Sequence, residues 1–97
     1  MNFKQVIQAF ENKQSAKSGN YESDSNSLFL FGNEIAKHTD KGVMFTLSGW
    51  NSPTTRKALS QLTGVCLRTV KGELFNNGVK INSTDWYFAN DGYKFTV

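Results

Sequence analysis

The sequence predicts an α+β fold, in which an N-terminal helix precedes a mainly antiparallel sheet or meander, with one short helix inserted and hairpins at the C-terminal end. Three observations predict this class. The chain has 97 residues, which is too few to divide into two domains. Glycine-containing turn signals separate several short apolar runs, as between antiparallel strands. Strands and helices do not alternate as a parallel sheet requires. We therefore expect residues 1–97 to form one domain.

The first segment is an amphipathic helix over residues 2–14, and Asn2 can cap its start. Its apolar residues recur at helical spacing, at Phe3, Val6, Ile7 and Phe10. Residues 15–27 then hold five serines and almost nothing to bury, which is typical of a mobile connector. We therefore interpret residues 1–14 as a helical arm, residues 15–27 as a Ser-rich connector, and residues 28–97 as the α+β core.

Three strands in succession follow this connector. Residues 28–31 form a short apolar run, and Gly32-Asn33 is expected to turn the chain into a second strand over residues 34–38. A second turn at residues 40–42 leads to a third strand, in which apolar and polar residues alternate over residues 43–47. Consecutive strands joined by tight turns predict a meander.

The strongest helix signal lies between Asn51 and Gly64. Ser52 can cap the helix, Pro53 suits its first position, and Gly64 suits the residue just past its end. The face expected to be buried carries Thr55, Ala58, Leu59 and Leu62.

Strands and hairpins are expected after this helix. Residues 65–70 read as a strand, and Asn77-Gly78 is a strong signal for a hairpin between residues 74–75 and 79–81. A last hairpin is expected between residues 86–88 and 93–97, with Asn90-Asp91-Gly92 as its turn.

Composition and cysteine usage indicate a protein of a reducing cytoplasm that acts without catalysis. The only cysteine, Cys66, leaves no partner for an internal disulfide, and no apolar run reaches the ~20 residues that a membrane helix needs. Cys66 and His38 could in principle form a thiol–imidazole pair, but structural roles are favoured for both. We predict no catalytic residue, no cofactor site and no metal site.

The net charge of +3 comes from one part of the chain. Residues 51–72 carry four basic residues and no acidic one, namely Arg56, Lys57, Arg68 and Lys71. Such a segment can bind an anionic partner, although two pairs of ordinary surface cations would give the same pattern. At the helix start, Thr54 and Thr55 together with the first two cations could also hold a phosphate or a carboxylate.

Aromatic residues supply further candidates for contact with a partner. Trp50 precedes the helix cap, and Tyr87 must point to the opposite face of its strand from Trp86 and Phe88. One of these faces belongs to the core and the other is a candidate binding surface. The predicted partner-binding residues are therefore Trp50, Thr54, Thr55, Arg56, Lys57, Arg68, Lys71 and Tyr87.

About two thirds of the chain resembles a family of short phage and prophage proteins of unknown function. The resemblance rests on Phe31-Gly32-Asn33-Glu34-Ile35-Ala36, Gly42-Val43-Met44-Phe45, Trp50-Asn51-Ser52-Pro53-Thr54-Thr55-Arg56-Lys57, and on Phe75-Asn76-Asn77-Gly78 followed by Trp86. Ala58 departs from the histidine that many members carry, so any ligand role of that histidine is absent here. Pro53 also interrupts the usual spacing of the threonines.

The resemblance implies a mobile-element origin, a location in the cytoplasm of the bacterial host cell, and an action by binding, as in inhibitors of CRISPR effectors. We therefore expect a protein that inhibits a bacterial defence system by stoichiometric binding to a host protein, such as a Cas effector or another defence nuclease. Two alternatives remain open: a nucleic-acid-binding protein that uses residues 51–72, and a virion or scaffold component. Neither the oligomeric state nor the partner follows from the sequence.

Overall fold

Two antiparallel sheets and two helices make up the part of the chain that the computed structural model describes, residues 2–40, 42–62 and 64–89. This arrangement confirms the predicted α+β class. The elements in chain order are α1 (Phe3–Glu11), β1 (Ser15–Ser18), β2 (Tyr21–Asp24), β3 (Ser27–Leu30), β4 (Asn33–Thr39), β5 (Gly42–Phe45), α2 (Pro53–Leu59), β6 (Leu67–Val70), β7 (Glu73–Asn76), β8 (Val79–Ile81) and β9 (Tyr87–Phe88).

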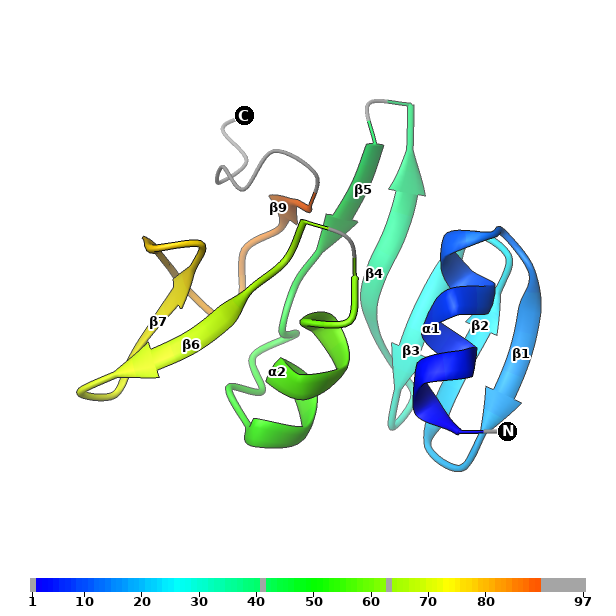
Figure 1. Cartoon of the computed structure of the whole chain (residues 1–97), viewed down its shortest axis with the longest axis horizontal. Helices are drawn as coiled ribbons and strands as arrows, with labels where there is room; N and C mark the ends of the chain where they lie inside the picture. The colour runs from blue at the N-terminus through cyan, green and yellow to red at the C-terminus, as the bar shows by residue number, and fades with distance from the viewer. Residues whose placement is uncertain (1, 41, 63, 90–97) are drawn as a thin grey trace.

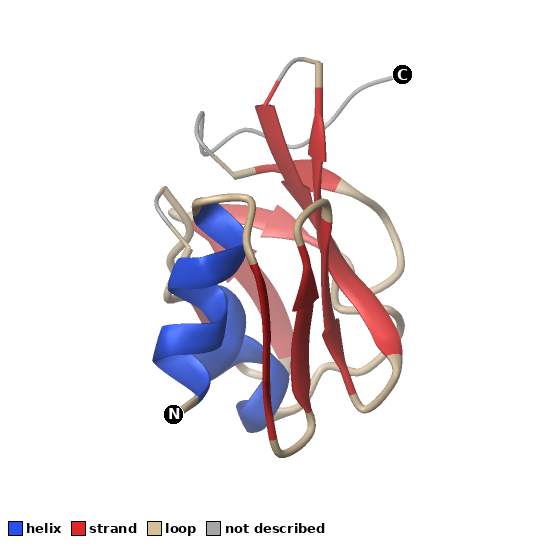
Figure 2. Cartoon of the chain, turned by 90° about the vertical axis from the view of Figure 1, so that its right-hand side faces the viewer, coloured by secondary structure: helices blue, strands red, loops and turns tan. Residues whose placement is uncertain are grey.

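The larger sheet has the strand order β1-β2-β3-β4-β5-β9, and the smaller sheet has the order β6-β7-β8 (Figure 1). The predicted meander is present as β3, β4 and β5, and β1 and β2 extend it. Both helices lie on the same side of the larger sheet (Figure 2). Buried apolar residues from both sheets and both helices form one continuous core.

Two-residue turns connect several of the strands. The turns Phe31-Gly32, Lys71-Gly72 and Asn77-Gly78 have a positive φ at both residues, as type I′ hairpins require. The predicted hairpin at Asn77-Gly78 is confirmed. The turn expected at Gly32-Asn33 instead begins one residue earlier, which places Phe31 in the turn. The hairpin expected at Asn90-Asp91-Gly92 lies outside the described residues.

The serine-rich segment is part of the sheet, so the predicted connector over residues 15–27 is wrong. β1 and β2 pair through Ser15↔Asp24 to Ser18↔Tyr21, and α1 packs against both strands. Ser23 is buried under the helix and donates a hydrogen bond from Oγ to the Gln14 carbonyl at 2.6 Å. Small hydroxyl side chains fit this space because they can satisfy their own hydrogen bonds beneath a helix.

α1 is likewise a core element and not a detached arm. Val6, Ile7 and Phe10 are fully buried, and Asn2 caps the helix together with Gln5 in a capping box. The helix ends at Glu11, short of the predicted residue 14. His38 on β4 ties this end to the sheet: its Nε2 donates to the Phe10 carbonyl at 2.7 Å, and its ring stacks on the Phe10 ring.

α2 begins as predicted and ends earlier. Ser52 is the N-cap and Pro53 the first helical residue, while the helix ends at Leu59 and Gly64 follows later with its predicted positive φ. The predicted apolar face is confirmed, because Thr55, Ala58, Leu59 and Leu62 are all buried. None of the helices within the described residues is long and apolar enough to cross a membrane.

Candidate functional site

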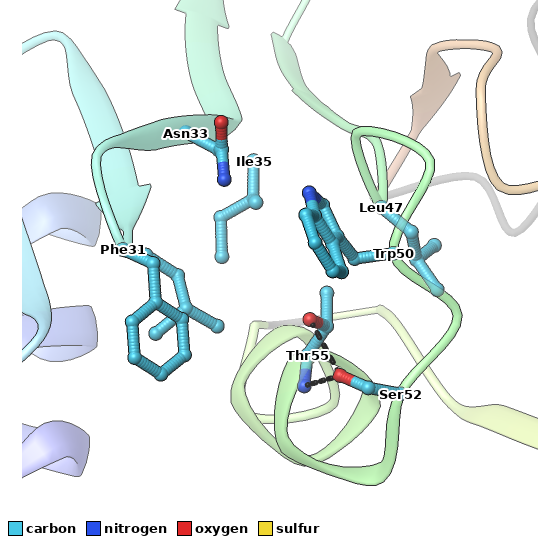
Figure 3. A pocket seen from close by; sticks show the side chains of 8 residues that line it. Phe31, Asn33, Ile35, Leu47, Trp50, Ser52 and Thr55 are labelled. Atoms are coloured by element: carbon cyan, nitrogen blue, oxygen red, sulfur yellow. Dashed lines mark hydrogen bonds between the residues drawn. The ribbon is translucent and has the colours of Figure 1, made fainter.

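An apolar pocket of about 300 Å³ opens between the β3–β4 turn and the segment that leads into α2 (Figure 3). Its lining residues are Leu30, Phe31, Asn33, Ile35, Leu47, Trp50, Ser52 and Thr55. Ile35 and Leu47 are buried and belong to the core. The pocket is therefore lined in part by residues of the core.

Two aromatic side chains, Phe31 and Trp50, stand on opposite sides of this pocket (Figure 3). Each is 62% exposed, and no other large hydrophobic side chain among the described residues is more exposed. Large aromatic residues that border an apolar pocket are typical anchors of protein–protein interfaces. We call this feature the aromatic pocket.

The backbone of Phe31 is held in an unfavourable conformation. Its φ is +52°, in a turn position where asparagine, aspartate or glycine is the usual residue. Its amide donates to the carbonyl of Asn20 in the β1–β2 turn at 2.9 Å, so the neighbouring hairpin supports it. A left-handed conformation at a bulky residue costs about 1–3 kcal/mol. Such local cost at an exposed aromatic residue points to a role outside folding.

The backbone of Trp50 is fixed on both sides. Its amide donates to the Leu47 carbonyl at 2.8 Å, and its carbonyl accepts from the Ser52 amide at 2.9 Å. Ser48, just upstream, donates from Oγ to the Glu34 carbonyl on β4. Because the loop is already ordered, less conformational entropy is lost when Trp50 contacts a partner.

The hydroxyl groups at the pocket are already used by the helix cap. Ser52 Oγ accepts from the Thr55 amide at 3.3 Å and also pairs with the Thr55 hydroxyl at 3.0 Å, as the dashed lines in Figure 3 show. Apart from the side chain of Asn33, the remaining lining of the pocket is apolar. The arrangement suits an apolar or aromatic group that enters between the two rings.

The predicted residues at the start of α2 have different surroundings and contacts. Thr54 is exposed, but Thr55 is buried and its amide is capped by Ser52. Arg56 donates from its guanidinium to the backbone carbonyl and to Oδ1 of Asn51, at 3.2 and 2.6 Å. Lys57 lies over the Phe3 ring of α1, with Nζ 5.4 Å from the ring centroid. The expected anion site therefore gains no support.

Arg68 and Lys71 lie elsewhere, in β6 and in the β6–β7 turn. Both are exposed. The basic segment over residues 51–72 thus distributes its cations over two elements, α2 and the β6–β7 hairpin.

Tyr87 belongs to the core, so its predicted exposure on a binding face is wrong. It is 4% exposed, its ring packs near Phe45, and its hydroxyl accepts from the Asn82 amide at 2.8 Å. The pairing Phe45↔Tyr87 turns this side chain inward and leaves Trp86 half-buried beneath Lys37, whose Nζ is 4.2 Å from the ring centroid.

Of the two exposed aromatic residues, Trp50 was expected from the sequence and Phe31 was not. The apolar run at residues 28–31 placed Phe31 within a strand, whereas the register Leu30↔Asn33 ends that strand at Leu30. The sequence signal for a turn at Phe31-Gly32 was the glycine, because glycine often takes the second position of a type I′ turn.

His38 and Cys66 are not brought together. His38 bonds the Phe10 carbonyl beside α1, and the exposed Cys66 precedes β6 in the other sheet. Within residues 2–40, 42–62 and 64–89, no three His, Cys, Asp or Glu side chains are grouped so that they could hold a metal ion.

The fold and the pocket define a small α+β protein with an aromatic-lined surface site. The family model for the Kyanoviridae Gp96 protein matches residues 2–96, so the chain belongs to this family of phage proteins. The match confirms the phage origin that the sequence resemblance implied. Searches among curated proteins and among solved structures found no match.

Proposed function

We propose that this protein acts by stoichiometric binding to another protein, and that an apolar side chain of this partner enters the aromatic pocket. The observation that carries the proposal is the pair of exposed rings, Phe31 and Trp50, on opposite sides of one pocket. Both residues have backbones fixed by hydrogen bonds. In this proposal the protein is not an enzyme and acts by covering a surface of its partner.

The surroundings of Phe31 resemble a polar interface rim. Phe31 also lines a second hollow of about 290 Å³, together with Gly32, Asn20 and the charged residues Lys17 and Glu22. Protein interfaces commonly combine an apolar centre with a polar border. A partner that inserts between the two rings would therefore also meet side chains with which it can form hydrogen bonds.

Membership in a phage family directs the search for this partner to proteins of the infected host. We propose that the partner belongs to a bacterial defence system, with Cas effectors and other defence nucleases as the first candidates. A virion protein is the alternative partner, which purification of phage particles would reveal.

The test compares four tagged forms of the protein in infected cells: wild type, Trp50→Ala, Phe31→Asn and Val70→Ala. Val70 is a matched control, because it is exposed but lies on β6, outside the pocket lining. Partners are identified by mass spectrometry, and the complex is rebuilt from purified components.

We expect a one-to-one complex with wild type and with Val70→Ala. Each pocket variant should bind about 30-fold more weakly or worse, because truncation of an anchor residue typically costs about 2 kcal/mol or more. Equal recovery of the partner by all four forms would contradict the pocket as its binding site. If the rebuilt complex leaves nuclease activity and CRISPR interference unchanged, the defence role is wrong while the binding role stands.

A further inference from the structure

The smaller sheet carries a row of three side chains that the sequence alone did not group. The strand register pairs Arg68 of β6 with Phe75 of β7, and Phe75 with Lys80 of β8. Residues directly opposite each other in neighbouring strands present their side chains on the same face. An aromatic ring therefore lies between two cations on one face of the sheet, which we call the outer face.

The outer face points away from the core. Leu74 and Ile81, which are paired on the opposite face, are buried in the core, and Leu67 packs against it. Successive side chains of a strand point to opposite faces, so Phe75 points outward. Phe75 is half-buried, whereas Arg68 and Lys80 are exposed.

The charge of this sheet is positive. Residues 67–81 contain Arg68, Lys71 and Lys80 against one acidic residue, Glu73. Glu73 pairs with Lys80 at 3.2 Å, and both side chains are more than half exposed. An exposed pair of this kind is weak, so a phosphate group can replace the carboxylate.

We propose that the outer face binds single-stranded nucleic acid, with a base stacked on Phe75 and with phosphates contacted by Arg68 and Lys80. Single strands offer both a polyanionic backbone and exposed base faces, and proteins bind them with cations beside aromatic platforms. This match of charge and ring favours a single strand over an acidic protein surface, which would use the cations but not the ring. The inference is independent of the aromatic pocket, because Phe75 does not line it.

The test measures fluorescence anisotropy of a labelled oligothymidine with the full chain at increasing salt. If Arg68 and Lys80 each contact a phosphate, the logarithm of the affinity should fall with the logarithm of salt with a slope of about −1.4. Phe75→Leu keeps an apolar side chain without a ring and should weaken binding about fivefold or more. Arg68→Glu should weaken binding more strongly.

Lys4→Glu is the matched control, because it makes the same type of charge reversal at an exposed position of α1. It should change the affinity less than Arg68→Glu does. A second readout uses Cys66, the single cysteine, which is exposed directly before β6 and can carry a fluorophore next to the row. Its signal should change on addition of the oligonucleotide.

The proposal is overturned if wild type shows no anisotropy change at low salt, or if Lys4→Glu weakens binding as much as Arg68→Glu. It is also overturned if duplex DNA binds as well as the single strand and Phe75→Leu has no effect, or if acidic peptide binds this face and the oligonucleotide does not. Trp50→Ala should leave oligonucleotide binding unchanged, which separates this result from a failure of the proposed protein-binding function.

Discussion

The two ends of the molecule differ in how far their side chains are buried. At one end, α1 covers β1, β2 and β3, and its Val6, Ile7 and Phe10 are fully buried (Figure 1). At the other end, Arg68–Val70 on β6 is exposed, and Leu74, Asn76 and Ile81 are the buried residues of the smaller sheet. We infer that the helix-covered end supplies most of the stability, while the smaller sheet leaves its outer face accessible to partners.

Truncation of a large aromatic side chain should give the largest difference in lost stability between the two ends. Phe10→Ala should lower the free energy of unfolding by about 3–5 kcal/mol, because it leaves a cavity under α1. Phe75→Ala should cost about 1 kcal/mol, because only part of that ring is buried. Urea unfolding followed by circular dichroism measures both values, and Phe10→Leu gives an intermediate point if Phe10→Ala does not fold. Equal losses at the two sites would contradict the comparison.

Within the smaller sheet, the buried Asn76 should matter more than the exposed residues around it. Its Oδ1 accepts the Cys66 amide at 3.0 Å. Asn76→Ala leaves this amide without its acceptor and should cost about 1–3 kcal/mol. Hydrogen exchange should accelerate at the Cys66 amide in particular. The control Lys80→Ala removes an exposed ion pair and should change stability little, so a loss as large as that of Asn76→Ala would refute the buried bond as the cause.

The two helix caps provide a comparison of smaller size. Ser52→Ala removes the cap of α2 and should lower the free energy of unfolding by about 1 kcal/mol. Asn2→Ala removes one half of the capping box of α1 and should have a similar effect. Thermal unfolding measures both, with Ser52→Thr as the conservative control. If Ser52→Ala leaves the free energy of unfolding unchanged, packing alone stabilises α2.

The smallest expected effect on stability has the opposite sign. Phe31→Asn should stabilise the protein by about 1 kcal/mol, because asparagine tolerates the left-handed conformation better than phenylalanine does. The same substitution should weaken partner binding in the proposed function. Thermal unfolding is the measurement, and a lower melting temperature would show that the ring contributes to folding instead.

Much of the fold could be predicted because its signals are local. Ser52 and Pro53 mark the start of α2 through backbone chemistry that needs no tertiary contact, and Asn77-Gly78 fixes a hairpin in the same way. Residues 15–24 contain one such signal, Gly19-Asn20, which forms the β1–β2 turn with a positive φ at Gly19, but the residues on either side of it are mostly polar. Their strands are rich in serine and half-exposed, and they become strands because α1 packs on them and Ser23 bonds the Gln14 carbonyl.

The site was predictable only in part, for a similar reason. Trp50 was identified from its aromatic side chain and its place before a helix cap, and it does line the pocket. Phe31 is exposed because the turn begins one residue earlier than expected. Tyr87 is buried because of the strand face that it presents when β9 pairs with β5. A shift of one residue reverses which side chains point inward, and apolar runs such as residues 28–31 and 86–88 do not fix that choice.

The pairing of β5 with β9 bears on the order in which the chain folds. Among the described strands, every other pair joins neighbours in the sequence, while this one brings Tyr87 beside Phe45 across the whole of α2 and the smaller sheet. Closing a long loop has a higher entropic cost than forming a hairpin, so this contact should be among the last to form. During synthesis, the helix-covered end can thus assemble while the remainder is still emerging from the ribosome.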